Sequence, residues 1–133
     1  MPERPLPRVD GESRGYWEAA RRHELLLQRC RGCEGYRHHP RAVCPNCLSS
    51  EVEWVVSAGR GEIYTFTVTY QNQSPGFAGR VPYILAYVLL EEGVQILTNI
   101  VDVTPEAVQI GQAVGVCFED LSEEISIPVF RLL

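Results

Sequence analysis

Four of the five cysteines in this chain are spaced in a way that suits metal binding. Cys30 and Cys33 form one C-x-x-C pair, Cys44 and Cys47 form a second, and ten residues separate the two pairs. The two-residue gap lets the chain turn back, so that both sulfurs of a pair face one ion at about 2.3 Å. Four thiolates suit Zn²⁺, which is redox-inert and imposes little geometry of its own. The spacing therefore predicts a structural zinc site with all four cysteines as ligands and no position open to substrate.

The remaining cysteine and two histidines are weaker candidates for chemistry. Cys117 lies between Val116 and Phe118 in a strand-like segment, so we expect a buried thiol, which is inert. His38 and His39 fall between the cysteine pairs and could compete as ligands, but we expect them at the surface or in a hairpin. No Ser/His/acid or Cys/His arrangement has the spacing of a nucleophilic site. The residues therefore predict no catalytic site.

The residue after the second cysteine of each pair bears on how well metal is held. A small residue is favoured there because the backbone must turn tightly. The chain has Glu34 and Leu48 at these positions, and Gly35 comes one place late. We therefore expect a slightly strained site, or one that binds metal less tightly. Redox dithiols, a site that has lost its metal and an iron–sulfur cluster are the alternatives to zinc.

The elements before the cysteines must help to position them. Residues 1–12 hold three of the nine prolines and are expected to form an extended arm. Ser13 can cap a helix over residues 14–23, with Tyr16 and Trp17 on one face. A helix of about ten residues is not stable alone in water, so it must dock. Docking on its own domain and docking on a partner chain are both open, since Tyr and Trp are frequent interface anchors.

The chain after the helix is expected to be mainly β. A short strand at 25–29 leads into a ribbon at 30–52, and a strand at 52–56 closes it. Alternating β-branched and aromatic residues predict five more strands, at 62–70, 83–90, 94–101, 113–119 and 125–131. Five strands in a segment of this length fit a closed OB-fold barrel. The predicted parts are an N-terminal arm and helix (1–27), a zinc ribbon (28–57) and a five-stranded OB-fold barrel (58–133).

Composition and charge limit the function classes. The chain has 133 residues and a net charge of −5, but residues 1–41 carry +3 and residues 42–133 carry −8. The acidic second part disfavours nucleic acid binding, because phosphate repels carboxylate. The basic first part is either a solvated surface or a patch for an anionic ligand or partner. No apolar run approaches the roughly 20 residues that cross a bilayer, and the N-terminus lacks the apolar core of a secretion signal. We therefore expect a cytoplasmic protein without membrane contact.

The order of these motifs resembles the DUF35 family. A Trp-bearing helix and the cysteine ribbon precede a G-x-G-x-x-Y-x-F-T-V strand, a P-G-F loop, a Pro-Tyr strand opening and an I-G-x-x-V-x-V-x-F strand. The matching residues are Trp17, Cys30, Cys33, Pro40, Arg41, Cys44, Pro45, Cys47, Gly59, Gly61, Tyr64, Phe66, Thr67, Pro75, Gly76, Phe77, Pro82, Tyr83, Ile110, Gly111, Val114, Val116 and Phe118. The likeness covers about residues 13–120 and departs from the family at Glu34, Leu48 and His39.

The resemblance implies a rubredoxin-like zinc ribbon fused to an OB-fold, working as a non-catalytic accessory subunit. The implied partners are thiolase-fold enzymes (thiolases or aldolases acting on steroid or fatty acyl-CoA thioesters) and MaoC-like enoyl-CoA hydratases. The implied role is to support the complex and to help bind or channel the CoA thioester. This chain would then contact acyl-CoA only as part of the complex with its partner enzyme. We expect it to bind no nucleic acid.

A loop at 71–82 is long for a barrel hairpin, and loops of this length are often functional or mobile. Phe77 is a candidate for docking, and Arg80 could bind a CoA phosphate or a partner carboxylate with its planar guanidinium. A plain flexible connection is the alternative. The residues expected to contact the partner or CoA are Tyr16, Trp17, Phe77, Arg80 and Tyr83.

Two other function classes stay open. A nucleic-acid-binding module is one, because zinc ribbons and OB-folds bind nucleic acid elsewhere. Tyr64, Phe66 and Tyr70 could stack on bases, but they alternate with Thr as core-facing strand residues do, and the barrel segment has only three Arg. A stand-alone redox protein is the other, and it would need a cysteine of low pKa.

Overall fold

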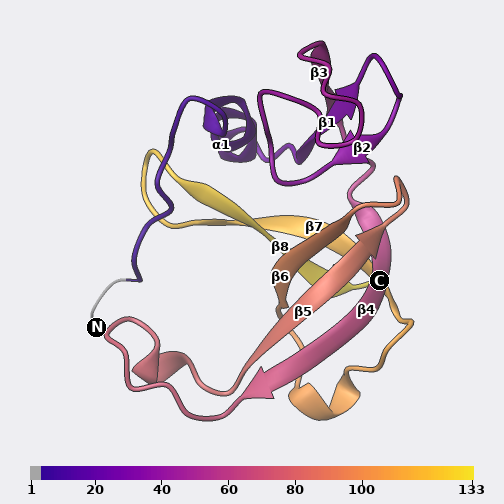
Figure 1. Cartoon of the computed structure of the whole chain (residues 1–133). Coiled ribbons are helices and arrows are strands. Elements are labelled where there is room, and N and C mark those ends of the chain that lie inside the picture. The colour runs from indigo at the N-terminus through magenta and orange to yellow at the C-terminus, as the bar shows by residue number, and fades with distance from the viewer. Residues whose placement is uncertain (1–3) are drawn as a thin grey trace.

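A small three-stranded sheet and a closed barrel account for the strands, and the small sheet lies above the barrel in Figure 1. The computed structural model describes residues 4–133. Its elements are α1 (Arg14–Arg21), β1 (Leu26–Cys30), β2 (Tyr36–Arg37), β3 (Val52–Val56), β4 (Arg60–Thr69), η1 (Ala78–Arg80), β5 (Tyr83–Leu90), β6 (Gln95–Ile100), η2 (Pro105–Ala107), β7 (Ala113–Asp120) and β8 (Ser126–Leu132). The predicted mainly β class is confirmed. Residues 4–10 are an arm without regular structure, and the first three residues of the predicted arm lie outside the described residues.

The barrel closes in the strand order β4-β5-β6-β8-β7, as the prediction of a five-stranded OB-fold requires. Its pairs are antiparallel except β6–β8, which are parallel and share only the register pair Ile100–Phe130. Buried side chains alternate along β5 and β6, and the Phe130 side chain of β8 is fully buried. The seam between β6 and β8 is therefore the least paired part of the barrel.

A β-bulge in β4 corrects one expectation about aromatic side chains. The register with β5 shifts between Ile63 and Thr65, which leaves Tyr64 as the extra residue. Tyr64 is 53% exposed and Tyr70, just beyond the strand, is 62% exposed. The prediction that both face the core is wrong: the bulge interrupts the two-residue period at Tyr64, and Tyr70 lies beyond the end of β4 at Thr69. Phe66 follows the bulge and packs against the core as expected.

The ribbon sheet has the order β2-β1-β3, and β1 connects it to the rest of the molecule. Leu25, just before β1, and Leu27, within β1, belong to the same buried cluster as Ile63 and Phe130 of the barrel. The core is therefore continuous between the ribbon sheet and the barrel. The boundaries expected after residues 27 and 57 stay a prediction.

Helix α1 packs on this chain, against β8 and β1. Tyr16, Ala19 and Ala20 form its buried face. Ser13 is the N-cap residue, but its side chain makes no cap hydrogen bond, because its hydroxyl accepts from the backbone N–H of Asp10 at 3.1 Å. The expected capping by Ser13 is thus wrong in its chemistry. No helix in residues 4–133 is both long and apolar enough to cross a membrane.

Candidate functional site

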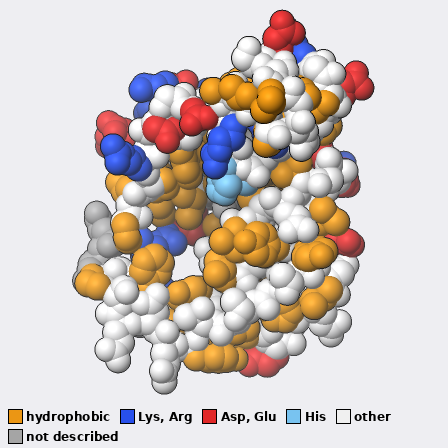
Figure 2. Space-filling model, in the orientation of Figure 1, with side chains coloured by type: hydrophobic (Ala, Val, Ile, Leu, Met, Phe, Trp, Pro, Cys, Tyr) orange, Lys and Arg blue, Asp and Glu red, His pale blue; other side chains and the backbone are white. Residues whose placement is uncertain are grey.

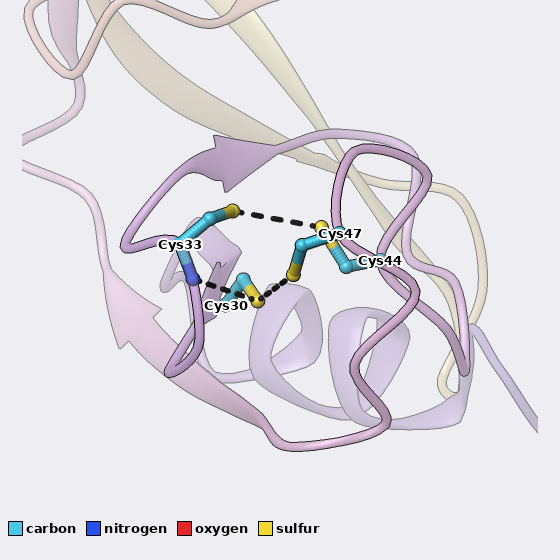
Figure 3. Close-up of side chains that lie close together, drawn as sticks. All are labelled: Cys30, Cys33, Cys44 and Cys47. Atoms are coloured by element: carbon cyan, nitrogen blue, oxygen red, sulfur yellow. Dashed lines mark hydrogen bonds between the residues drawn. The ribbon is translucent and has the colours of Figure 1, made fainter.

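The four predicted metal ligands converge between the two loops of the ribbon (Figure 3). The Sγ atoms of Cys30 and Cys47 lie 3.5 Å apart, those of Cys33 and Cys44 lie 3.7 Å apart, and all four lie within 4.8 Å of one another. A tetrahedral ion with metal–sulfur bonds of about 2.3 Å has sulfur–sulfur edges of about 3.8 Å. The spacing of the sulfurs therefore fits one tetrahedral ion held by all four side chains.

Equivalent backbone hydrogen bonds shape the two loops. The N–H of Glu34 donates to the carbonyl of Cys30 at 2.8 Å, and the N–H of Leu48 donates to the carbonyl of Cys44 at 2.9 Å. Each bond brings the chain back just after the second cysteine of its pair. Both sulfurs of a pair are thus placed on the same side of their loop before any ion is considered.

Backbone N–H groups also stabilise negative charge on two of the sulfurs. The N–H of Cys33 lies 3.5 Å from the sulfur of Cys30 and is the main cause that lowers the pKa of this thiol to about 6. The pKa of Cys44 is lowered mainly by the N–H of Cys47. The pKa of Cys47 is raised to about 11, because the neighbouring sulfurs and burial outweigh the lowering by the N–H of Ser49.

The lowered pKa values of Cys30 and Cys44 thus come mainly from backbone N–H groups, and the raised pKa of Cys47 comes from the neighbouring sulfurs and burial. Sulfurs this close cannot all carry charge unless a cation lies between them. The cluster therefore has the donor set and the electrostatics of a metal centre, and Cys30 and Cys44 are the ligands best prepared to be thiolates.

The other sulfur and imidazole candidates lie outside this cluster. Within the described part of the chain, the one group of His, Cys, Asp or Glu spaced for metal binding contains the four cysteines alone. Cys117 is half-buried on β7, opposite Val129, whereas we expected a fully buried residue. His38 follows β2 directly and is half-buried against the Tyr16 ring, with 5.3 Å between the centroids. Of the two placements that we expected, at the surface or in a hairpin, the surface placement is wrong for His38.

Three of the predicted contact residues come together at the β4–β5 loop, at the lower left of the barrel in Figure 1. Phe77, Arg80 and Tyr83 line a hollow of about 170 Å³, together with Arg4 of the N-terminal arm. The Phe77 and Tyr83 rings lie 6.2 Å apart, and the Arg80 Nε donates to the carbonyl of Gly76 at 2.8 Å. The loop contains the short helix η1, Ala78–Arg80.

Charge at this hollow is mixed. Arg80 is exposed, and its neighbour Arg4 pairs with Glu119 of β7. The Arg80 Nε is engaged within its own loop, whereas the terminal nitrogens of the same guanidinium have no hydrogen bond among the described residues. Sequence reasoning did not find Arg4, because nothing in its spacing indicates that the arm returns to the barrel.

The other two predicted contact residues lie elsewhere. Tyr16 is only 5% exposed and its ring packs edge-on against Trp17 at 4.9 Å. A partner contact through Tyr16 does not fit this placement. Trp17 is half-buried and lines a different cavity, between α1, the ribbon and the barrel. The structure thus separates Trp17 from the Phe77 group.

One further polar cluster joins the segment just after α1 to the barrel and was missed by sequence reasoning. His23 Nε2 and Ser126 Oγ lie 2.8 Å and 2.5 Å from the same Oδ1 atom of Asp120. Asp120 thus lies between the serine and the histidine, and the contact of the buried Ser126 hydroxyl is with the carboxylate and not with the imidazole. This order differs from that of a nucleophilic triad, in which the histidine contacts the serine. The cluster is therefore a structural contact that holds the segment after α1 against β7 and β8.

Two family models match consecutive parts of the chain. Residues 17–53 match the model described as "ChsH2, rubredoxin-like zinc ribbon domain". Residues 54–119 match the model described as "ChsH2, C-terminal OB-fold domain". The first match contains all four clustered cysteines, and the second contains the loop with Phe77, Arg80 and Tyr83.

Relatives in other organisms match over different shares of their length. A "probable enoyl-CoA hydratase alpha subunit" of Thermomonospora curvata is 35% identical over 96% of this chain, which spans 40% of that protein. A "DUF35 domain-containing scaffold protein" of Methanocaldococcus jannaschii is 35% identical over 77% of this chain and 73% of that protein. The "benzoylsuccinyl-CoA thiolase subunit BbsA" of Geobacter metallireducens is 38% identical over 54% of this chain and 47% of that protein.

A solved structure described as "Ltp2-ChsH2(DUF35) aldolase" contains a chain with the same fold. The two chains superpose with a TM-score of 0.86 and share 34% sequence identity. The match covers 95% of this chain and 98% of that chain. The whole arrangement of arm, helix, ribbon and barrel is therefore common to both.

Proposed function

Because the chain belongs to the DUF35 family of zinc-ribbon and OB-fold proteins, we propose that it is a non-catalytic accessory subunit of a thiolase-like enzyme acting on acyl-CoA thioesters. The observation that carries this proposal is the full-length match to the DUF35 chain described with an aldolase. The relatives named as a scaffold protein and as a thiolase subunit support the same role. A MaoC-like hydratase is a second partner class, supported by the relative named as a hydratase subunit.

The proposed metal is zinc, with a structural role. Four sulfurs within 4.8 Å of one another would fill the four positions of a tetrahedral Zn²⁺ and leave none for water or substrate. The ion would cross-link the two loops of the ribbon, which the described structure otherwise joins through few regular hydrogen bonds. The metal would thus fix the conformation of the two ribbon loops and take no part in a reaction.

The hollow at the β4–β5 loop is the proposed contact surface for the partner or for CoA. Phe77 and Tyr83 offer aromatic area, and Arg80 offers an exposed guanidinium whose terminal nitrogens have no hydrogen bond within residues 4–133. A guanidinium binds phosphate or carboxylate through two parallel hydrogen bonds. The hollow thus combines an apolar anchor with an anion-binding group. It is too small to enclose a whole CoA molecule, so it would contact one part of it.

Purification of the tagged chain from its own host tests the accessory role. Light scattering gives the mass of the purified species, and mass spectrometry identifies what co-purifies. We expect a stoichiometric thiolase-like or hydratase-like partner and a mass well above the 15.0 kDa of this chain. A monomer of 15.0 kDa, or co-purifying nucleic acid in place of a protein, would contradict the proposal.

Variants at the loop test the contact surface. Phe77→Ala and Arg80→Gln should weaken assembly or acyl-CoA turnover of the complex while metal content stays unchanged. Arg60→Gln is the matched control, since Arg60 is also an exposed barrel arginine and pairs with Glu91 away from this loop. Normal assembly and turnover in both loop variants would exclude this hollow as the contact surface.

A further inference from the structure

A second, larger cavity lies where the arm, α1 and the ribbon meet the barrel. It has a volume of about 420 Å³ and opens at the seam between β6 and β8, where the barrel strands share a single register pair. Figure 2 shows this region as a hollow with hydrophobic walls and with His and Arg or Lys side chains on its upper edge. The volume lies in the range of small-molecule sites, which is roughly 300–1,000 Å³. None of the loop residues Phe77, Arg80 and Tyr83 lines it.

The walls of the cavity have two different chemistries. Trp17 of α1, Leu97 of β6 and Ile127 of β8 form an apolar side. Arg8 of the arm and Arg41 after the ribbon loop contribute cationic groups, and His38 lies with them. Leu97 is 50% exposed, so apolar surface remains open to solvent at this seam. A ligand that fills the cavity would therefore need an apolar body and a polar end.

The polar side of the cavity has a buried hydrogen-bonding atom without a partner. The Nδ1 atom of His38, which lines the cavity, is buried and has no hydrogen bond among the described residues. Buried polar atoms are nearly always paired, so such a group needs an explanation. Burial, and then the charges of His39 and Arg41, lower the pKa of His38 to about 4, which keeps its ring neutral at pH 7. A neutral imidazole can still donate one hydrogen bond to an anion.

The acidic residues of the cavity already have partners. Asp10 Oδ1 accepts from the backbone N–H of Ser13 at 2.8 Å, and Glu12 Oε2 accepts from the N–H of Ala42 at 2.7 Å. Arg41 donates through one terminal nitrogen to the carbonyl of Pro40, and its other terminal nitrogen has no hydrogen bond in the described part of the chain. Arg8 has no hydrogen bond among the described residues. The cationic groups are therefore the ones available to a ligand.

The balance of charge decides which anion suits the cavity. Its lining contains two arginines, Arg8 and Arg41, two acids, Asp10 and Glu12, and two histidines, of which His38 is neutral. One negative charge placed beside the arginines would be accommodated, whereas a doubly charged phosphate or the several phosphates of CoA would be repelled by the acids. This preference separates the cavity from the CoA contact proposed at the β4–β5 loop.

We propose that this cavity is a binding site for a small carboxylate with an apolar body, with the carboxylate beside Arg41, Arg8 and His38 and the body against Trp17, Leu97 and Ile127. The site does not depend on the proposed accessory function, because every group that forms it belongs to this chain. A ligand here would also bridge the arm, α1 and the ribbon to the barrel, and would thus stiffen their arrangement.

Tryptophan fluorescence measures binding directly. The chain has two tryptophans, and Trp54 does not line the cavity, so Trp54→Phe leaves Trp17 as the single reporter. Decanoate, 1-decanol and inorganic phosphate serve as probes, each below the concentration at which it aggregates. We expect decanoate to give a saturable change in Trp17 emission, with decanol and phosphate at least about tenfold weaker. Equal affinity for decanol and decanoate, or no saturable signal, would overturn the proposal.

Charge-removing variants locate the carboxylate. Arg41→Gln and Arg8→Gln, each in the Trp54→Phe background, should weaken decanoate binding about threefold or more, since both side chains are exposed and partly screened. Arg80→Gln should leave it unchanged. If Arg41→Gln lowers the stability of the fold, the Arg8→Gln variant still tests the proposal, because Arg8 lies in the irregular arm. Loss of binding in Arg80→Gln, or full binding in Arg8→Gln, would overturn the assignment. A monomer that still binds decanoate would refute the accessory function and leave this site intact.

Discussion

Glu34 and Leu48 occupy the same backbone conformation, with φ angles of 63° and 64°, each directly after the second cysteine of its pair. This is the left-handed region that side chains other than glycine rarely adopt. The tight turn expected at these two positions is therefore present, although Glu and Leu side chains disfavour its left-handed backbone conformation. Leu48 is 77% exposed, so its side chain contributes little packing in return.

Replacing Leu48 by glycine should stabilise the ribbon. The left-handed conformation costs a residue such as Leu about 1–2 kcal/mol, and the added freedom of glycine in the unfolded chain returns part of this. We expect Leu48→Gly to raise the free energy of unfolding by about 0.5–1 kcal/mol. Thermal unfolding of the metal-loaded protein measures the change, and competition with a chelator measures metal affinity, which should rise or stay equal.

Ala42→Gly is the matched control for this substitution. Ala42 is also exposed in the ribbon, but it is not among the residues with positive φ. Glycine there should lower stability by a few tenths of a kcal/mol up to about 1 kcal/mol, because only the unfolded chain gains freedom. If both glycine variants lower stability equally, the conformation at Leu48 carries no strain.

Removing one ligand should unfold the cysteine loops and leave the barrel intact. We expect Cys44→Ser to lose bound zinc and to speed amide hydrogen exchange across residues 31–51. The barrel amides should keep their protection, because Leu25 and Leu27 anchor β1 in the barrel core independently of the metal. Metal analysis and hydrogen exchange by mass spectrometry measure the two effects.

Cys117→Ser is the control for loss of a thiol. Cys117 lies on β7, outside the cluster, so its variant should retain the full metal content. Full metal content in Cys44→Ser, or metal loss in Cys117→Ser, would contradict the assignment of the four ligands.

Much of the fold could be predicted because its signals are local. The C-x-x-C spacing places two sulfurs on one loop whatever the rest of the chain does, and alternating side chains mark the barrel strands. The observed strand ends differ from the predicted ones by one or two residues. For example, β4 begins at Arg60 and not at Glu62, because Gly61 already pairs with Leu90 and Val114. Such pairing depends on neighbours distant in sequence.

Features that depend on long-range contacts could not be predicted. The bulge that exposes Tyr64 arises from its register with β5. The return of Arg4 to Glu119, the cluster of His23 with Asp120 and the burial of His38 all join segments far apart in the chain. No spacing rule in a single sequence specifies such contacts, so the cavity at the β6–β8 seam appears only in three dimensions.

Adding one methyl group at Gly61 should destabilise the barrel. A Cβ at this position would lie 2.3 Å from the carbonyl oxygen of Leu89, which is backbone and cannot move aside. We expect Gly61→Ala to lower the free energy of unfolding by about 1–3 kcal/mol. Gly11→Ala is the control, since nothing lies within 4 Å of its added Cβ, and it should change stability by less than about 0.5 kcal/mol. Urea unfolding compares the two, and equal effects would contradict the close approach of β4 and β5.

Burial of His38 should make stability depend on pH. Burial and the charges of His39 and Arg41 lower the pKa of His38 to about 4 in the folded chain, whereas an unfolded histidine titrates near 6.5. Between these values the unfolded state binds a proton that the folded state does not. The contribution of His38 is therefore full above about pH 6.5 and falls as the pH drops towards 4, with a slope of at most about 1.4 kcal/mol per pH unit.

The variant His38→Gln isolates this contribution from other acid-sensitive groups, the cysteines included. Urea unfolding at pH 7, 6 and 5 should show that wild type loses more stability than His38→Gln over the same interval, because glutamine does not titrate. Proton NMR of the imidazole ring should place the midpoint of His38 near pH 4 in the folded protein. A midpoint near 6.5, together with equal losses in both proteins, would show that the ring is solvated and that its Nδ1 has a partner in solution.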